Sequence, residues 1–171
     1  VDGEVLLVLC YVDDIIIASS SDSQKLWLKA KFCSEYRMTD CGGLEWFLEM
    51  RISRARQAGT ITLDQERYLR TILDRFGFGE CKPCSTPAVP GLRISSDMSA
   101  TTEEEIEYIE SKPFRSAVGS LMYAMVATHP EIASALCVIC RFMSRPGRRH
   151  WKAVKQIFKY LKGHADLGLT F

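Results

Sequence analysis

Two adjacent acids between two apolar runs limit the possible folds of this chain more than any other stretch does. Asp13 and Asp14 follow the run Val5 to Cys10 and precede the run Ile15 to Ala18. Each run has the length and the β-branched or aliphatic content of a buried strand. Two such strands joined by a tight turn predict a β-hairpin with both acids at its tip.

The chemistry of the acid doublet allows two interpretations. A single Asp in a turn is ordinary, because its side chain bonds local backbone amides. Two adjacent carboxylates on an apolar hairpin repel each other, and partial burial disfavours their ionisation unless cations neutralise them. Mg²⁺ would do so, since it takes one or two protein carboxylates together with substrate phosphates. A metal site and a structural turn both remain open from this stretch alone.

Length and composition are those of an ordinary globular protein. The chain has 171 residues, of which 47% are hydrophobic and 25% charged, and this length predicts one or two domains. Its apolar runs are too short to cross a bilayer and no secretory signal opens it, so we expect an intracellular protein with no membrane partner. The chain lacks an initiator Met and opens within a predicted strand, which predicts a piece of a longer protein.

The net charge of +1 conceals two segments of opposite sign. Residues 101–110 carry five Glu and no base, whereas residues 132–165 carry eight Lys or Arg and no acid. A solvated helix face usually mixes charge signs, so the missing acids favour contact with a nucleic-acid backbone; a solvated face remains the alternative. The predicted backbone contacts are Arg148, Arg149, Lys152, Lys155, Lys159 and Lys162.

The first half of the chain alternates predicted strands and helices. After the hairpin, an amphipathic helix is expected over Ser23 to Arg37, with Ser21 and Asp22 as candidate N-caps. One strand is expected over Leu44 to Ile52, and a turn at Gly59 then leads to a second strand over Thr60 to Leu63. Asp64 can cap the next helix, whose apolar face is Tyr68, Leu69, Ile72, Leu73 and Phe76 and which Gly77 and Gly79 end.

The second half is predicted to be helical after a long connection. Cys81 to Pro90 carries three Pro and is expected to be extended. Leu92 to Lys112 is acidic and poorly periodic, which predicts a mobile loop with a turn or two of helix. Three helices should follow: one over Phe114 to Val126, one starting at Pro130, and one with the core face Trp151, Val154, Phe158 and Leu161.

Seven Cys in a chain without secretory features predict reduced thiols. Cys81 and Cys84 form one C-x-x-C pair, and Cys137 and Cys140 form another, which can indicate zinc. Core packing accounts for Cys140 without a metal, because it lies in the apolar stripe of the second predicted helix of this half.

Several stretches in order resemble the copia-type retrotransposon reverse transcriptases. They are "LLVLCYVDDIIIA", "FLEMRISR", "GTITLDQERYLRTILDRFGF", "CKPCSTP", "FRSAVGSLMYAMVATHPEIA" and "SRPGRRHWKAVKQIFKYLKGHADLGLTF". The resemblance covers Val5 to Phe171 and implies an α+β fold, in which palm-type antiparallel hairpins precede a helical thumb and connection. It implies the C-terminal part of the palm at residues 1–63, a helix and connecting segment at 64–112, and the thumb and connection at 113–171.

The resemblance also implies an activity, RNA-directed DNA synthesis with two Mg²⁺ (or Mn²⁺) ions. Asp13 would be the direct metal ligand and Asp14 the supporting carboxylate, while Tyr11 and Val12 would lie against the primer terminus. The hairpin that holds the primer end would include Leu48, Glu49 and Met50. The partners implied are an RNA template, a DNA primer, dNTP and the other polyprotein domains (fingers, RNase H and integrase), in a cytoplasmic particle.

Glu49 departs from the pattern of the family, in which most members carry Gly at this position. A bulky acid is hard to accommodate if the backbone there needs a positive φ or a close approach to a primer phosphate. In the alternative interpretation, this hairpin has only a structural role and its two strands pack on the palm.

Three hypotheses therefore stand. In the first, the chain is part of a polymerase whose fingers and first catalytic Asp precede Val1 and whose RNase H domain follows Phe171, so the chain alone is inactive. In the second, it is a remnant that binds nucleic acid or protein without catalysis, which Glu49 and His129 (usually Arg in the family) would fit. In the third, it is a zinc-stabilised binding module.

Overall fold

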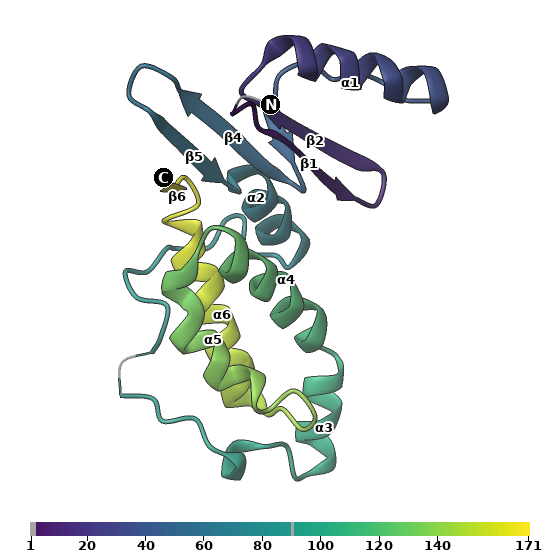
Figure 1. Ribbon diagram of the computed structural model, residues 1–171. Coiled ribbons are helices and arrows are strands. Elements are labelled where there is room, and N and C mark those ends of the chain that lie inside the picture. The colour runs from purple at the N-terminus through teal and green to yellow at the C-terminus, as the bar shows by residue number, and fades with distance from the viewer. Residues whose placement is uncertain (1–2, 90) are drawn as a thin grey trace. The chain divides into compact units, whose positions relative to one another are not determined.

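The computed structural model describes residues 3–89 and 91–171 and divides into two units, Val1–Leu44 and Glu45–Phe171 (Figure 1). The described residues form two antiparallel sheets and six α-helices, which confirms the predicted α+β class. Two predicted segments include residues outside the described ranges: the first hairpin segment includes residues 1–2, and the extended connection includes Pro90.

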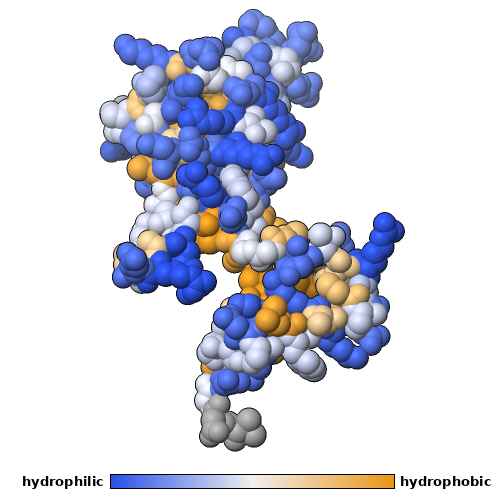
Figure 2. All heavy atoms as spheres, turned by 90° about the horizontal axis from the view of Figure 1, so that it is seen from above, coloured by the Kyte–Doolittle hydropathy of each residue, from blue (hydrophilic) through white to orange (hydrophobic). Residues whose placement is uncertain are grey.

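The first unit is the predicted hairpin followed by one helix. Strands β1 (Leu6–Tyr11) and β2 (Asp14–Ser19) pair antiparallel along their whole length, and α1 (Asp22–Glu35) follows. Two strands and one helix offer little area for burial, and no described residue of 3–44 is buried. Leu7 of β1 is 63% exposed and Trp27 of α1 is 64% exposed. Figure 2 shows hydrophobic areas among the hydrophilic ones on one face of the molecule.

The second unit opens with a second hairpin where one strand was predicted. Leu44 to Ile52 is not a single strand, because the chain reverses at Leu48 and Glu49 between β3 (Trp46–Phe47) and β4 (Met50–Ala55). Strand β5 (Thr60–Asp64) then pairs antiparallel with β4, as predicted from the turn at Gly59.

A short strand from the end of the chain completes this sheet. β6 (Gly168–Thr170) pairs antiparallel with β5 and was not predicted. Gly168 is needed there, because a Cβ on this residue would lie 2.6 Å from the carbonyl oxygen of Leu63. The sheet order is β3-β4-β5-β6.

The helices of the second unit surround α6 (Arg148–Lys162), as Figure 1 shows. Helix α2 (Glu66–Arg75) buries the predicted face at Leu69, Ile72 and Leu73. The rings of Phe158 in α6 and Phe78 stack at 4.8 Å between centroids. The other helices of this core are α4 (Phe114–Ala127), the 3₁₀ turn η2 (Pro130–Ile132) and α5 (Ala133–Cys140). All three helices predicted for this half are present, but α5 begins at Ala133, because the predicted start at Pro130 is a 3₁₀ turn.

The acidic segment was predicted as a mobile loop with a turn or two of helix, and it contains two short helical elements. It contains the 3₁₀ turn η1 (Ser96–Met98) and α3 (Glu103–Glu110). Thr102 and Glu105 form a capping box at the start of α3, in which each side chain bonds the other residue's backbone N–H. Ile109 is buried in the common core, so one apolar residue among the acids anchors the helix.

A buried histidine joins this segment to the start of α6. The Gly147 backbone N–H donates to Nδ1 of His150 at 2.8 Å, so the proton is on Nε2, which donates to the Ser95 carbonyl at 3.2 Å. The imidazole ring also stacks on Phe142, with centroids 4.4 Å apart. Burial lowers the pKa of His150, since the charged form loses solvation.

We predict that this histidine makes stability depend on pH. Below about pH 6.5 His150 becomes protonated in the unfolded chain but stays neutral in the folded chain, where its pKa is lower. The free energy of unfolding therefore falls as the pH falls toward the pKa of the folded state. Urea unfolding at pH 7, 6 and 5 should show a smaller loss for His150→Gln than for the wild type. Equal losses in the two proteins would contradict the assignment.

Candidate functional site

The acid doublet lies at the tip of the first hairpin, as predicted. Tyr11 and Asp14 are paired across the strands, so Val12 and Asp13 form a two-residue loop. Val12 has a φ of 51°, which is strained for a β-branched residue. Such conformations persist where the surrounding structure imposes them, and they gather at functional sites.

Both carboxylates are open to solvent. Asp13 and Asp14 are exposed, Val12 beside them is 82% exposed, and neither acid forms an ion pair with a described residue. Two adjacent carboxylates fit the oxygen ligands that Mg²⁺ takes from proteins. The described residues contain no group of three or more His, Cys, Asp or Glu that could hold a metal.

The second hairpin has a turn that is strained at both residues. Leu48 has a φ of 49° and Glu49 a φ of 58°, the pattern of a type I′ turn, which favours Asn-Gly. The backbone at Glu49 therefore has the positive φ that makes a bulky acid hard to accommodate there. Met50 is half-buried at the start of β4, and Glu49 is exposed.

A tyrosine that the sequence did not single out holds this turn. The Tyr123 hydroxyl of α4 donates to the carbonyl oxygen of Leu48. Its ring meets the ring of Tyr68 edge to face, with centroids 5.0 Å apart. The Tyr68 hydroxyl donates to the Ser120 carbonyl at 3.0 Å, one turn before Tyr123. No motif marks these contacts, because they join residues far apart in the sequence.

Acidic side chains from other segments of the chain lie near the basic stripe of α6. This stripe consists of Arg148, Arg149, Lys152, Lys155, Lys159 and Lys162. Arg148 pairs with Glu104 of α3 at 2.7 Å and lies 4.3 Å from the centroid of Tyr108. Arg149 and Lys152 are exposed. Thus the acidic segment, although remote in the sequence, neutralises part of the predicted surface, and Arg148 is less available to a phosphate than Lys152.

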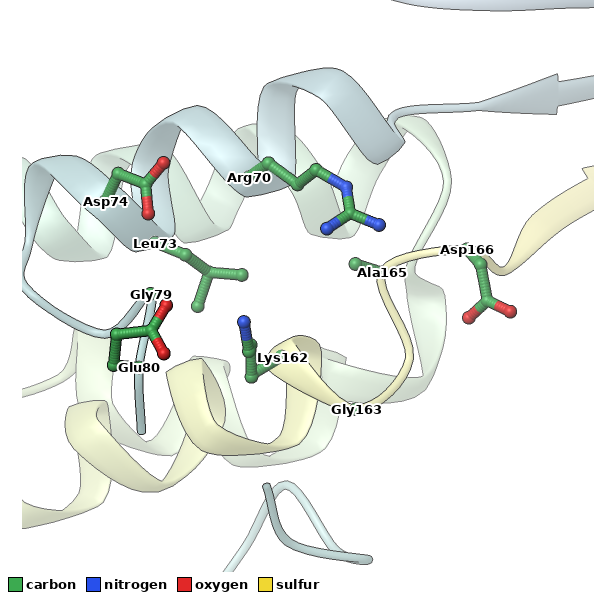
Figure 3. A pocket seen from close by; sticks show the side chains of 9 residues that line it. All are labelled: Arg70, Leu73, Asp74, Gly79, Glu80, Lys162, Gly163, Ala165 and Asp166. Carbon is green, nitrogen blue, oxygen red and sulfur yellow. The ribbon is translucent and has the colours of Figure 1, made fainter. Parts of the chain in front are cut away.

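The far end of the stripe lies in a pocket of mixed charge. The pocket has a volume of ≈ 400 Å³, and Figure 3 shows Lys162 pointing into it from α6 while Arg70 extends from α2. Asp74, Glu80 and Asp166 also line it. Lys155 and Lys159 are half-buried, and the Cys84 backbone N–H donates to the Lys159 carbonyl at 3.2 Å, so an extended segment runs along the helix between the two ends.

The four cysteines of the C-x-x-C pairs are thiols in different surroundings. The Cys84 thiol donates to the Gln156 carbonyl at 3.5 Å and lies against α6. Burial raises the pKa of the Cys140 thiol, which disfavours the thiolate that zinc requires. Cys137 is exposed and Cys81 is half-buried.

An α+β chain with an acid doublet at a hairpin tip is consistent with part of a nucleic-acid polymerase. Residues 1–90 match the family Reverse transcriptase (RNA-dependent DNA polymerase), which is more than half of the chain. The chain belongs to this reverse transcriptase family, and its predicted kinship with the polyproteins of copia-type retrotransposons is confirmed.

The relatives are mostly much longer proteins. The retrovirus-related Pol polyprotein from transposon TNT 1-94 of Nicotiana tabacum is 41% identical over 99% of this chain and 13% of its own length. An uncharacterized mitochondrial protein of Arabidopsis thaliana is 33% identical over 96% of this chain and 64% of its own length. The Pol polyprotein from transposon RE1 of the same plant is 28% identical over 96% of this chain and 11% of its own.

No solved structure matches the chain. Within the residues that the structure describes, no helix has the length and apolar character needed to span a membrane.

We predict that Glu49→Gly stabilises the protein. A left-handed backbone costs a non-glycine residue about 1–2 kcal/mol, and glycine removes this cost. Glycine also raises the conformational entropy of the unfolded chain, which lowers the stability by about 0.5–1 kcal/mol. The net gain should be about 1 kcal/mol, or about 2–4 °C in Tm for a protein of this size. Calorimetry measures it.

Gln57→Gly is the matched control for this substitution. Gln57 is also an exposed residue between two strands, but it is not among the residues with positive φ. It should lose stability on replacement by glycine. An equal gain at both positions would contradict the role of the positive φ at Glu49.

Proposed function

We propose that the chain is the C-terminal palm and the thumb and connection of a copia-type RNA-directed DNA polymerase. The observation that carries this proposal is the exposed acid doublet at a strained hairpin tip in a chain of the reverse transcriptase family. The palm part would be residues 1–63, the connecting part 64–112, and the thumb and connection 113–171. The template RNA, the DNA primer, dNTP and the other polyprotein domains would be its partners, in a cytoplasmic particle.

The acids would hold the ions of the two-metal reaction. When bound, two Mg²⁺ (or Mn²⁺) ions supply activation of the primer 3′-hydroxyl and neutralisation of the leaving pyrophosphate. Asp13, which stands in the loop itself, is the direct ligand in this proposal, and Asp14 at the start of β2 is the supporting carboxylate. Their exposure supports the role, because an entering substrate phosphate must share the same ions.

Two other groups of residues would position the nucleic acid. Tyr11 and Val12 precede the acids and would lie against the primer terminus; their side chains are 52% and 82% exposed. The turn at Leu48 and Glu49, with Met50, would hold the primer end. The α6 cations would contact the phosphate backbone, and among them Arg149 and Lys152 are the most open.

A catalytically inactive remnant is the second candidate. Glu49 favours it, because a strained acid stands in a turn that would face a primer phosphate. Metal-dependent synthesis by the longer protein separates the two candidates.

We predict that Asp13 is essential for synthesis in the longer protein that includes the fingers. Asp13→Asn removes one ligand charge at an exposed tip, so it should abolish Mg²⁺-dependent primer extension while leaving thermal stability within about 0.5 kcal/mol. The 171-residue chain alone should extend no primer. Extension by the chain alone, or by the Asp13→Asn variant, would contradict this assignment.

We predict that α6 contributes to the salt dependence of nucleic-acid binding. Arg149→Gln with Lys152→Gln, at the two most open cations of α6, should reduce the slope of log affinity against log salt by about 1.8 for a duplex, because each phosphate contact contributes about 0.9. Fluorescence anisotropy with a labelled primer–template measures the slope.

Lys29→Gln with Lys31→Gln is the matched control. It removes the same charge from α1, where the two lysines pair with Asp40 and Glu35. The control should leave the slope nearly unchanged. Equal changes in the two variants would show that net charge, rather than the α6 surface, sets the affinity.

A further inference from the structure

The turn between β3 and β4 is under backbone strain that its own residues do not relieve. Leu48 and Glu49 both have positive φ, and neither is Gly, Asn or Asp. Each left-handed non-glycine residue costs about 1–2 kcal/mol, so an isolated hairpin with this loop would favour another conformation. Contacts from outside the hairpin must therefore hold the turn.

Tyr123 supplies such a contact. Its hydroxyl donates to the Leu48 carbonyl, which belongs to the first residue of the loop. A carbonyl can accept this bond only when its peptide plane faces the hydroxyl. The bond therefore restrains the rotation that would release the turn.

Tyr123 is itself held in place by a second tyrosine. Tyr68 of α2 packs edge to face on it, and the bond from the Tyr68 hydroxyl to the Ser120 carbonyl fixes Tyr68 against α4. Burial raises the pKa of Tyr68, so its hydroxyl stays protonated and remains a donor. An aromatic side chain with two rotatable bonds, packed between two helices, places its hydroxyl with little freedom.

We propose that Tyr123 is a positioning residue for the turn at Leu48 and Glu49, and that it sets the geometry with which this turn meets a primer end. The contact with primer rests on the proposed function, whereas the restraint on the turn does not. A purely packing role for Tyr123 would need the ring alone, and phenylalanine would then serve equally well.

The first measurement is of the turn itself, by nuclear magnetic resonance of the 171-residue chain. Three-bond HN–Hα couplings and residual dipolar couplings at Leu48 and Glu49 report their φ angles. Tyr123→Phe should shift these couplings toward averaged values. Tyr68→Phe is the comparison variant, because it removes the bond to Ser120 but leaves the Tyr68 ring and the Leu48 bond in place. It should shift these couplings less than Tyr123→Phe does.

Glycine at position 49 supplies a rescue. Gly adopts positive φ without the cost of a Cβ, so Glu49→Gly should restore the couplings in the Tyr123→Phe background. Rescue also shows that Tyr123→Phe folds and that its effect acts through the turn. Failure of Glu49→Gly to restore the couplings contradicts the inference.

The second measurement is the ratio of affinities for a primer–template with a recessed 3′ end and for a blunt duplex of equal length. The loss of one hydrogen bond should lower this ratio by about 3- to 10-fold in Tyr123→Phe. Affinity for the blunt duplex should not change, and a variant that merely loses structure would weaken both.

The outcomes separate the inference from the proposed function. Unchanged couplings in Tyr123→Phe overturn the inference whatever the affinities are. Shifted couplings with an unchanged affinity ratio support the restraint on the turn and contradict the contact with a primer end. Shifted couplings together with a reduced ratio support the whole inference.

Discussion

The burial of the apolar face of α6 is the interaction on which the second unit depends. Phe158 at its centre stacks on Phe78 and packs against Phe76, so the segment that follows α2 is fixed to the last helix of the chain. Helices α2, α3, α4 and α5 all contact α6, and the core they form is continuous. This common core gives α2 and α4 a fixed spacing. Tyr68 and Tyr123 can meet only because that spacing holds.

The two hairpins place their candidate functional residues in the same kind of loop. Each has a two-residue loop between paired strands, and each loop contains a non-glycine residue with positive φ. The first loop presents carboxylates to solvent, and the second presents a strained backbone that a tyrosine restrains.

The sequence predicted the elements whose signals are local and failed where the signal lies elsewhere in the chain. The acid hairpin followed from two apolar runs, and the buried faces of α2, α4 and α6 followed from helical spacing. The turn at Leu48 and Glu49 was missed, because neither residue is a turn former and the apolar pattern continues through both. The segment that contains α3 was predicted as a mobile loop with only a turn or two of helix, because its acids hide Ile109, the residue of α3 that is buried in the core.

The candidate site was likewise predictable only where its residues are close together in the sequence. Asp13 and Asp14 are at the predicted tip, but Glu104 beside Arg148 and the acids around Lys162 come from segments that the spacing of lysines cannot reveal. Tyr123 was invisible for the same reason, since its bond to Leu48 spans 75 positions.

The pairing of β6 with β5 has a consequence for the order of folding. Thr62 and Thr170 bond each other across 108 positions, and the segment between them contains every helix of the second unit. Closing so long a loop carries an entropic penalty that local helix formation does not, so topology delays this strand pair relative to the helices. From this topology we expect the sheet that carries the Leu48 turn to be completed late, after the helices that restrain the turn have assembled.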